Sequence, residues 1–430
     1  MILRNTRSIT LDPPLIKDCD IRIVDGAIVD VLPKVRPGRG EETVDMSGKI
    51  VMPGFVNSHT HLYSSLSRGM PAPSTSPRNF PEILRKIWWK LDEALDEESI
   101  YYSALVGAIE SAKLGTTTLV DHHASPNHIY NSLDLIKEGI SRIGLRGILC
   151  YETTDRGGRK RRDAGLDENE RFLTENANNS HFRGTVGAHA SLTLSGESLG
   201  MLGELAGIYD CGVHIHVAED KADVQDCRKR HRVGIVDRLS EFGVLSKKSI
   251  FAHGVHLNQK ELSRVDRSKT WMVHNPRSNM NNRVGYAPLH WFGERSALGT
   301  DGFPSDMFEE SEIGYFRNVE SASRTKFQRL PTMLQSGQQL VSEFFGRPFG
   351  RIAKGSPADL IVVEYNPPTP LHSKNLIGHF LFGMNSASVQ HVMIDGNWVV
   401  WDRQVLGIDE QAVMDKASRV ASKLWKRMNG

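Results

Sequence analysis

The chain has 430 residues, 39% of them hydrophobic, which is enough to bury one large domain and a smaller one. Its 53 basic and 51 acidic residues leave a net charge of +2, so no overall field favours nucleic acid or an anionic membrane, and we expect a small-molecule partner. The four scattered cysteines, the lack of an apolar leader and the lack of any run of about 18 apolar residues predict a cytoplasmic protein without disulfides or membrane spans.

The two ends of the chain carry similar hairpin patterns. Segments 19–33 and 388–406 each place β-rich residues on both sides of an Asp-Gly pair. Each segment is too short to form a core alone, so we expect the two to pack together with a strand in 354–366. This predicts a small β-sandwich built from both chain termini.

The central part opens with "VMPGFVNSHTHLYSS", which begins as a buried strand and ends with His59 and His61. Because side chains alternate along a strand, both imidazoles point to the same side and can bind one divalent cation. A histidine pair alone is weak evidence, since most such pairs bind nothing. Residues 68–95 follow as a Pro-rich loop and a helix, long enough to cover the strand end as a lid.

Further along, short β-like runs alternate with longer helical or loop stretches. Eight such runs indicate a parallel sheet and fit a (β/α)8 TIM-type barrel, with a doubly wound sheet as the alternative. The basic and then acidic segment 156–170 is expected to be a solvated loop. The predicted order is sandwich, barrel, sandwich and final helix, over residues 1–52, 53–348, 349–408 and 409–430.

Polar residues close most of these runs. In a barrel the carboxyl ends of the strands share one rim, where catalytic groups gather. His216 and Asp301 would there join the first histidine pair, and three imidazoles with one carboxylate suit zinc or iron, with room left for water. The residues at the strand ends are His59, His122, His189, His216, His253, His274 and Asp301.

Several strings resemble a known family. "PGFVNSHTHLYSSLSRG", "HVAED", "AHGVHL", "VHNPRSN" and "LGTDG", in that order, resemble the amidohydrolase superfamily, in its branch of mononuclear aminohydrolases that contains guanine and adenosylhomocysteine deaminases and s-triazine hydrolases. The strings "DHHASP", "ETTDR" and "GTDGFPSDMFEE" resemble more narrowly the SsnA-like aminohydrolases, which are associated with purine catabolism. The resemblance spans nearly the whole chain and implies the barrel fold, one metal ion and a hydrolase.

The resemblance also implies roles for individual residues. Glu219 corresponds to a proton-shuttling glutamate and His253 to a histidine beside the bound water or reacting carbonyl, while His214 is assigned to the barrel interior. Segment 181–195 contains no lysine, and a carboxylated lysine there bridges the metals of binuclear members, so one metal is expected. The implied metal ligands are His59, His61, His216 and Asp301.

These residues suit a hydrolysis. A bound divalent ion lowers the pKa of its water from 15.7 toward about 7, which makes hydroxide available at neutral pH. Asp301 can take the proton of that water, His253 can stabilise charge on the tetrahedral species, and Glu219 can carry a proton to the ring nitrogen and the leaving amine.

Residues that contact the substrate are harder to select from the sequence. Arg68 can bind an oxygen-rich ring or brace the lid, Asn279 can bind the substrate or organise its loop, and only one of His122 and His123 is expected to face the pocket. Trp88 and Trp89 are expected to pack, although either would favour a planar heterocycle if it lined the pocket. The predicted substrate contacts are Arg68, His122, His189 and Asn279.

Three functions compete. The first is a metal-dependent aminohydrolase acting on a C–N bond of a nitrogen heterocycle, purine- or pterin-like, with zinc preferred over iron as cofactor. The second opens a cyclic amide with the same machinery, and the third is a non-catalytic binding protein on the same fold. Because every expected position is filled, the first is favoured, and the resemblance further implies a homodimer.

Overall fold

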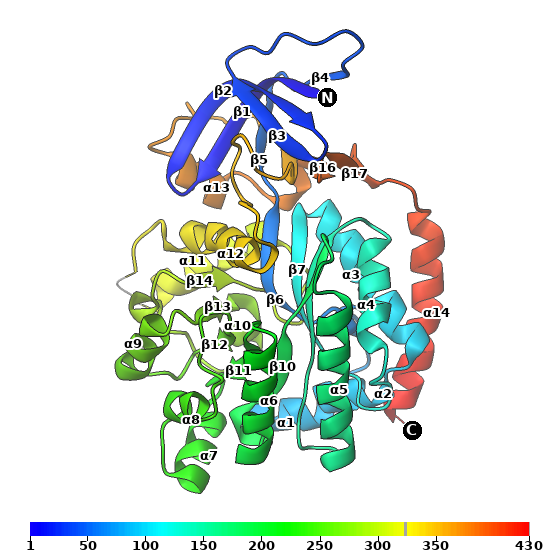
Figure 1. Ribbon diagram of the computed structural model, residues 1–430, viewed down its shortest axis with the longest axis vertical. Helices are drawn as coiled ribbons and strands as arrows, with labels where there is room; N and C mark the ends of the chain where they lie inside the picture. Colours follow the sequence, from blue (N-terminus) through cyan, green and yellow to red (C-terminus); the bar gives the residue numbers. More distant parts are fainter. Residues whose placement is uncertain (322–324, 430) are drawn as a thin grey trace.

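The computed structural model describes residues 1–321 and 325–429, with a sheet at one end and a larger α/β body at the other (Figure 1). Among these residues the terminal sheet has nine strands, in the order β18-β17-β16-β15-β5-β1-β2-β3, with β4 beside β1. The strands are β1 Ile2–Leu11, β2 Pro14–Val24, β3 Ala27–Leu32, β4 Thr43–Asp45, β5 Lys49–Pro53, β15 Leu360–Glu364, β16 Val389–Ile394, β17 Asn397–Trp401 and β18 Gln404–Val405.

Both expected Asp-Gly hairpins are present in this sheet. Asp25 and Gly26 join β2 to β3, Asp395 and Gly396 join β16 to β17, and all four residues have positive φ. Such a pair of left-handed residues gives the tight turn whose twist matches that of the flanking strands. Strands from the two ends of the chain therefore pair in one sheet.

The terminal sheet buries side chains on both faces. Alternate residues of β15 point in opposite directions, so that Ile361 and Val363 join the main core whereas Leu360 and Val362 join a smaller cluster. The smaller cluster also contains side chains of β2 and β3, for example Ile21, so the sheet curls around a core of its own. Two facing sheets and the domain limits expected from the sequence stay predictions.

The larger body contains two parallel sheets among the described residues, in the orders β6-β7-β8-β9 and β10-β11-β12-β13-β14. Single β-bridges join Thr60 to Asp301 and Thr153 to Ala188, so the two sheets touch at both edges. The mixed α/β class is confirmed, while a closed barrel stays a prediction. The strands are β6 Phe55–Thr60, β7 Thr116–His123, β8 Arg146–Tyr151, β9 Phe182–Gly184, β10 Val186–Ala190, β11 Val213–Val217, β12 Ile250–His253, β13 Trp271–His274 and β14 Ser296–Leu298.

The fourth β-like run of the sequence is split between the two sheets. β9 pairs with β8 in one sheet and β10 pairs with β11 in the other, with Thr185 between them. The Thr185 N–H donates to the carbonyl of Leu149 at 3.1 Å, and its hydroxyl donates to the carbonyl of Gly212 at 3.0 Å. Thr185 therefore connects the sheets where a continuous strand was expected.

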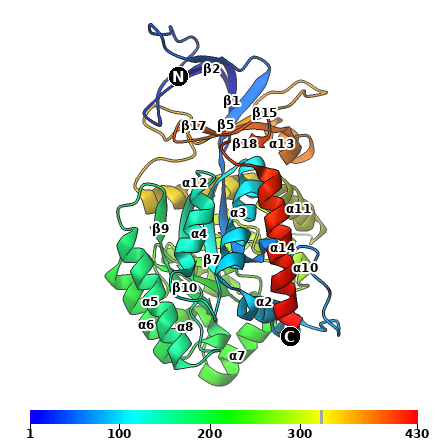
Figure 2. The same cartoon turned by 90° about the vertical axis from the view of Figure 1, so that its right-hand side faces the viewer.

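Helices follow most strands and surround the two sheets (Figure 2). The expectation of a loop over 156–170 is wrong, because Arg159–Glu175 forms α5, which buries Leu166 and Phe172. No described helix is both long and apolar enough to span a membrane. The longer helices are α3 Glu97–Lys113, α4 Ser132–Ser141, α5 Arg159–Glu175, α6 Gly196–Ile208, α7 Lys221–His231, α8 Ile235–Glu241, α9 Gln259–Arg267, α10 Pro276–Asn281, α11 Met307–Glu320, α12 Arg329–Phe345 and α13 Leu376–Phe382.

The segment expected to form a lid contains a short helical stretch, made of α1 Phe80–Ile83, the π-helical turn η2 Leu84–Trp88 and α2 Trp89–Ala94. The predicted final helix is present as α14 Glu410–Asn429, and it runs beside α2 and α3 (Figure 2). The indole N–H of Trp425 donates to the carbonyl of Leu66 at 2.9 Å, and Nε of Arg427 donates to the carbonyl of Ala94 at 2.7 Å. The last helix thus holds the end of α2 in place.

Candidate active site

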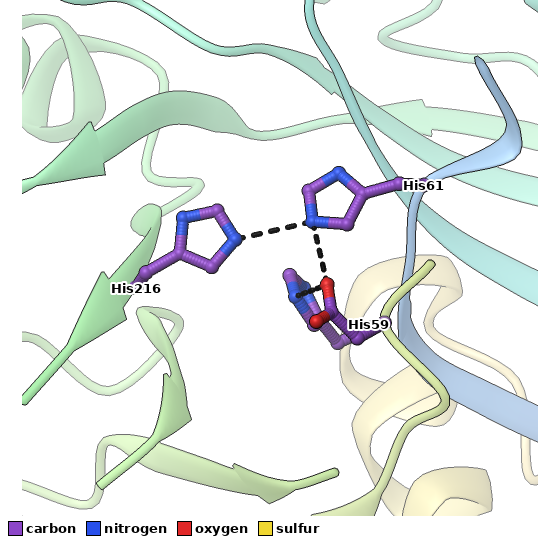
Figure 3. A group of neighbouring side chains, drawn as sticks. His59, His61 and His216 are labelled. Atoms are coloured by element: carbon purple, nitrogen blue, oxygen red, sulfur yellow. Dashed lines mark hydrogen bonds and ion pairs between the residues drawn. The ribbon is translucent and has the colours of Figure 1, made fainter. Parts of the chain in front are cut away.

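Three histidines and one aspartate from distant parts of the chain meet at the carboxyl ends of the strands (Figure 3). One nitrogen or oxygen of each lies within 4.8 Å of those of the other three. Nε2 of His61 is 3.1 Å from Nε2 of His216 and 2.9 Å from Oδ1 of Asp301, which is 3.5 Å from Nε2 of His59. Ligands placed tetrahedrally about 2.0–2.1 Å from a zinc ion lie roughly 3.3 Å apart, so the donor atoms fit one ion.

Each of these imidazoles is oriented through its other nitrogen. Nδ1 of His61 donates to the carbonyl of His122 at 2.6 Å, and Nδ1 of His216 donates to the carbonyl of His189 at 2.8 Å. Nδ1 of His59 lies 2.8 Å from Nε2 of His214. These contacts turn all three Nε2 atoms toward the centre, as in protein metal sites. Nε2 of His59 is buried and has no hydrogen-bond partner among the described residues. A bound cation would give this nitrogen a partner for its lone pair.

The backbone places Asp301 against the first strand. Asp301 has a φ of 55°, its N–H donates to the carbonyl of His59 at 3.0 Å, and its carboxylate accepts a hydrogen bond from the Ser278 hydroxyl. Burial alone would raise the pKa of Asp301, but interactions with His59 and His61 hold it well below its usual range. Burial likewise opposes protonation of His61, yet Asp301 raises the pKa of this imidazole to about 9. The site therefore stabilises positive charge next to an ionised carboxylate.

A second acid and another histidine stand beside this group. Oε2 of Glu219 lies 3.6 Å from Nε2 of His253, and Oε1 accepts a hydrogen bond from Asn282 at 3.3 Å. Burial, with the nearby charge of Asp301, raises the pKa of Glu219 well above its usual value. Nδ1 of His253 contacts Oδ1 of Asn279 at 2.8 Å, which orients the ring. Glu219 therefore keeps a proton more readily than an exposed carboxylate would, close to the candidate metal centre.

These groups open into a cavity. Its empty space is about 610 Å³, counted out to its open mouth. Its lining combines metal-centre residues with residues of the helical stretch of the lid. Residues that line the cavity include His61, Tyr63, Phe80, Leu84, Trp88, Trp89, Asp92, Glu152, His189, His216, Glu219, Ser278, Asn282 and Asp301.

Comparison with known proteins agrees with this arrangement. The model of the amidohydrolase family matches residues 50–399 of the chain. The chain belongs to the amidohydrolase family. The 5-methylthioadenosine/S-adenosylhomocysteine deaminase of Pelotomaculum thermopropionicum is 30% identical to it over 99% of both chains. The 5'-deoxyadenosine deaminase of Methanosarcina mazei is 28% identical over 100% of this chain and 99% of its own.

Solved structures show the same fold. An adenosine deaminase from Xanthomonas campestris, determined with bound zinc, aligns with a TM-score of 0.87 and 21% sequence identity, covering 99% of this chain and 98% of its own. The amidohydrolase is therefore a hydrolase of carbon–nitrogen bonds other than peptide bonds, and it carries a candidate metal site of three histidines and one aspartate.

The substrate contacts expected from the sequence are placed unevenly in this amidohydrolase. His189 lines the cavity, with Nδ1 bonded to the Thr193 hydroxyl at 2.6 Å. His122 lies behind the cavity wall, where Nδ1 is 3.5 Å from Glu152. Asn279 is engaged with His253, which agrees with its alternative role of organising the loop. Arg68 pairs with Glu110 of α3 at 2.8 Å and lines a neighbouring hollow. Roles for all four in substrate binding stay predictions.

Sequence reasoning missed some residues of the cavity. Asp92 and Glu152 are buried acids that line it, and Arg156 joins them from behind. Nothing in the sequence distinguishes Asp92 from the neighbouring surface acids of "KLDEALDEES". Glu152 follows a buried strand as the polar residues at the other strand ends do, so that position was the one available signal. Both tryptophans line the cavity, the arrangement that favours a planar ligand.

Proposed function

We propose that this amidohydrolase is a deaminase: it removes an amino group from a purine- or pterin-like heterocycle, with one divalent ion held by His59, His61, His216 and Asp301. The observation that carries the proposal is the convergence of three oriented Nε2 atoms and a carboxylate next to Glu219, whose pKa burial raises. The names of the two relatives, both deaminases of adenosine-type compounds, support a purine ring as substrate.

Zinc is the preferred ion, with iron as the alternative, because nitrogen and carboxylate donors suit both. When bound there, such an ion polarises water and lowers its pKa toward about 7. The relative with a solved structure has zinc, which supports the same choice here. The homodimer and the cytoplasmic location stay predictions from the sequence.

The side chains divide the proton transfers. Asp301, kept ionised by its two histidine neighbours, can accept a proton from water, and Glu219 can deliver one to the ring nitrogen and to the departing amine. The side-chain oxygen of Asn279 favours a proton on Nδ1 of His253. Nε2 of His253 can therefore donate a hydrogen bond only when both ring nitrogens are protonated, and in that form it can stabilise negative charge on the oxygen bound to the reacting carbon. Overall a C–O bond replaces the C–N bond, and water supplies the hydrogen that leaves with ammonia.

A substrate screen tests the proposal. The purified, metal-analysed protein is assayed for ammonia release from adenosine, 5'-deoxyadenosine, guanine, pterins, cytosine and aminotriazines, and the products are identified by mass spectrometry. Ammonia together with an intact ring that has gained a carbonyl is expected from at least one purine or pterin. Ring opening without ammonia would favour cyclic-amide hydrolysis instead. If the fully metal-loaded protein turned over none of these compounds, the deaminase proposal would be abandoned.

A further inference from the structure

One wall of the cavity carries a charge network that begins next to the metal centre, because a carboxylate oxygen of Glu152 lies within 4.8 Å of a nitrogen of His216. Nη2 of Arg156 lies 3.1 Å from Oε1 of Glu152 and 3.3 Å from Oδ2 of Asp92, and its guanidinium stacks over the ring of Trp89 at 4.6 Å. The three groups come from α2, from the end of β8 and from the loop before α5. Two carboxylates thus face one guanidinium, so this wall favours positive charge and hydrogen-bond donors over anions.

Asp92 has one oxygen that the network does not use. The residue is 2% exposed and lines the cavity, and its Oδ1 has no hydrogen-bond partner within the described residues. A side-chain hydrogen bond with the Tyr63 phenol also lowers the pKa of the carboxylate, less than Arg156 does. An acceptor buried without a partner costs about 1–3 kcal/mol, and more when it is charged. A purely structural ion pair with Arg156 would not offset this free-energy cost.

We propose that Asp92 is a substrate-binding residue that accepts a hydrogen bond from a second exocyclic amino group, at an end of the heterocycle other than the one that reacts. The inference rests on the proposed function, because the reacting end must lie at Glu219, which lines the same cavity as Asp92. It narrows the substrate class to flat rings with a second exocyclic amino group. Rings that carry a carboxylate or phosphate at that end are excluded by the two acids.

The aromatic residues of the wall agree with a flat ligand. Trp88 and Trp89 line the cavity on either side of the turn that leads into α2, and Asp92 follows one helical turn later. Nε1 of Trp89 is also buried without a hydrogen-bond partner among the described residues, so the cavity lining has an unused donor as well as an unused acceptor. An aminated ring edge, with N–H groups next to a ring nitrogen, matches this pair.

The test compares two purines that differ by one amino group. Adenine and 2,6-diaminopurine are titrated into the metal-loaded Glu219→Gln protein, which should bind without turnover, and the affinities are measured by calorimetry. 2,6-Diaminopurine is expected to bind about tenfold more tightly, the size of a hydrogen bond to a charged group. Adding Asp92→Asn should reduce this preference to about twofold or less. The control is Glu93→Gln, which changes the neighbouring exposed acid of α2 and should keep the preference.

Each outcome decides the proposal. Equal affinity for the two purines, binding of neither, or a preference that survives Asp92→Asn would overturn it. If the Asp92 variant does not fold, the comparison of the two purines on the otherwise unmodified protein decides alone. Because binding is measured without turnover, a failure here is distinct from a failure of ammonia release, which concerns the deaminase proposal.

Discussion

The two sides of the cavity are built in different ways. The metal-centre side consists of residues at the ends of parallel strands, and hydrogen bonds to neighbouring carbonyls or to His214 fix each imidazole. The lid side consists of short helical turns that carry Asp92, which is held by a contact with Arg156 from the loop before α5. We infer that the first side fixes the chemistry and the second side selects the ligand, and variants on the two sides should therefore fail differently.

The largest effect is expected from His216→Ala. Removing one imidazole from the set of four should abolish tight binding of the ion and reduce turnover more than about a thousandfold. Metal content per chain and ammonia release are measured together. His290→Ala, an exposed histidine, is the control and should keep both. A variant of His216 with full metal and full activity would contradict the proposed ligand set.

Glu219→Gln should separate chemistry from metal binding. The amide cannot carry the proton, so kcat should fall about 10²–10⁴-fold while metal content stays unchanged. Single-turnover rates with the substrate found in the screen give the measurement. Full activity of this variant would refute the role of Glu219, whereas loss of metal would show that the residue supports the ion instead.

Asn279→Ala tests positioning on the metal-centre side. Without the amide oxygen at 2.8 Å the His253 ring loses its orientation, and kcat should fall about 10–100-fold with little change in KM. A rise in KM at unchanged kcat would instead support the substrate-binding role that the sequence suggested for Asn279. Steady-state kinetics with the metal content checked distinguish the two results.

On the lid side, acid should weaken ligand binding. Burial, opposed by Arg156, raises the pKa of Asp92 to about 7, with Glu152 and Tyr63 as the other titratable groups facing it. A protonated carboxyl is a poorer acceptor, so the affinity of Glu219→Gln for 2,6-diaminopurine should fall a few-fold between about pH 8 and about pH 6. Adding Asp92→Asn should remove that dependence. Tighter binding in acid would argue against a carboxylate acceptor.

The smallest effect is expected from Arg68→Met. The Arg68 side chain is 55% exposed and pairs with Glu110, and exposed pairs of this kind contribute little. The value of kcat/KM should change by less than about twofold. A tenfold loss would restore the sequence-based expectation that Arg68 contacts the substrate and would extend the binding site into the neighbouring hollow.

Residues with a local signal could be predicted from the sequence. The His-x-His spacing and the polar residues at the ends of buried strands predict which side chains point the same way without knowledge of the fold. The reason is that side chains alternate along a strand, which fixes the ones that share a face. His59, His61, His216 and Asp301 meet in space as that reasoning expected. Element types were also readable, since the Asp-Gly hairpins and the final helix depend on nearby residues.

Features that depend on tertiary contacts could not be predicted in this way. Asp92 and Arg156 are ordinary charged residues until packing removes water from both. The sequence left two roles open for Asn279, and only the arrangement of β12 against α10 brings its amide to His253. His214 is buried, and its contact with His59 depends on how strands far apart in sequence face each other.

Contacts between α14 and the lid make the position of the cavity lining depend on the last turns of α14. Arg427 binds the carbonyl of Ala94, two residues beyond Asp92, and also pairs with Asp96 at 2.9 Å. A fusion tag or proteolytic trimming at the carboxyl terminus would therefore disturb ligand selection without touching any group that performs the reaction. For recombinant work, a tag at the amino terminus, which lies on the terminal sheet, is the safer choice (Figure 1).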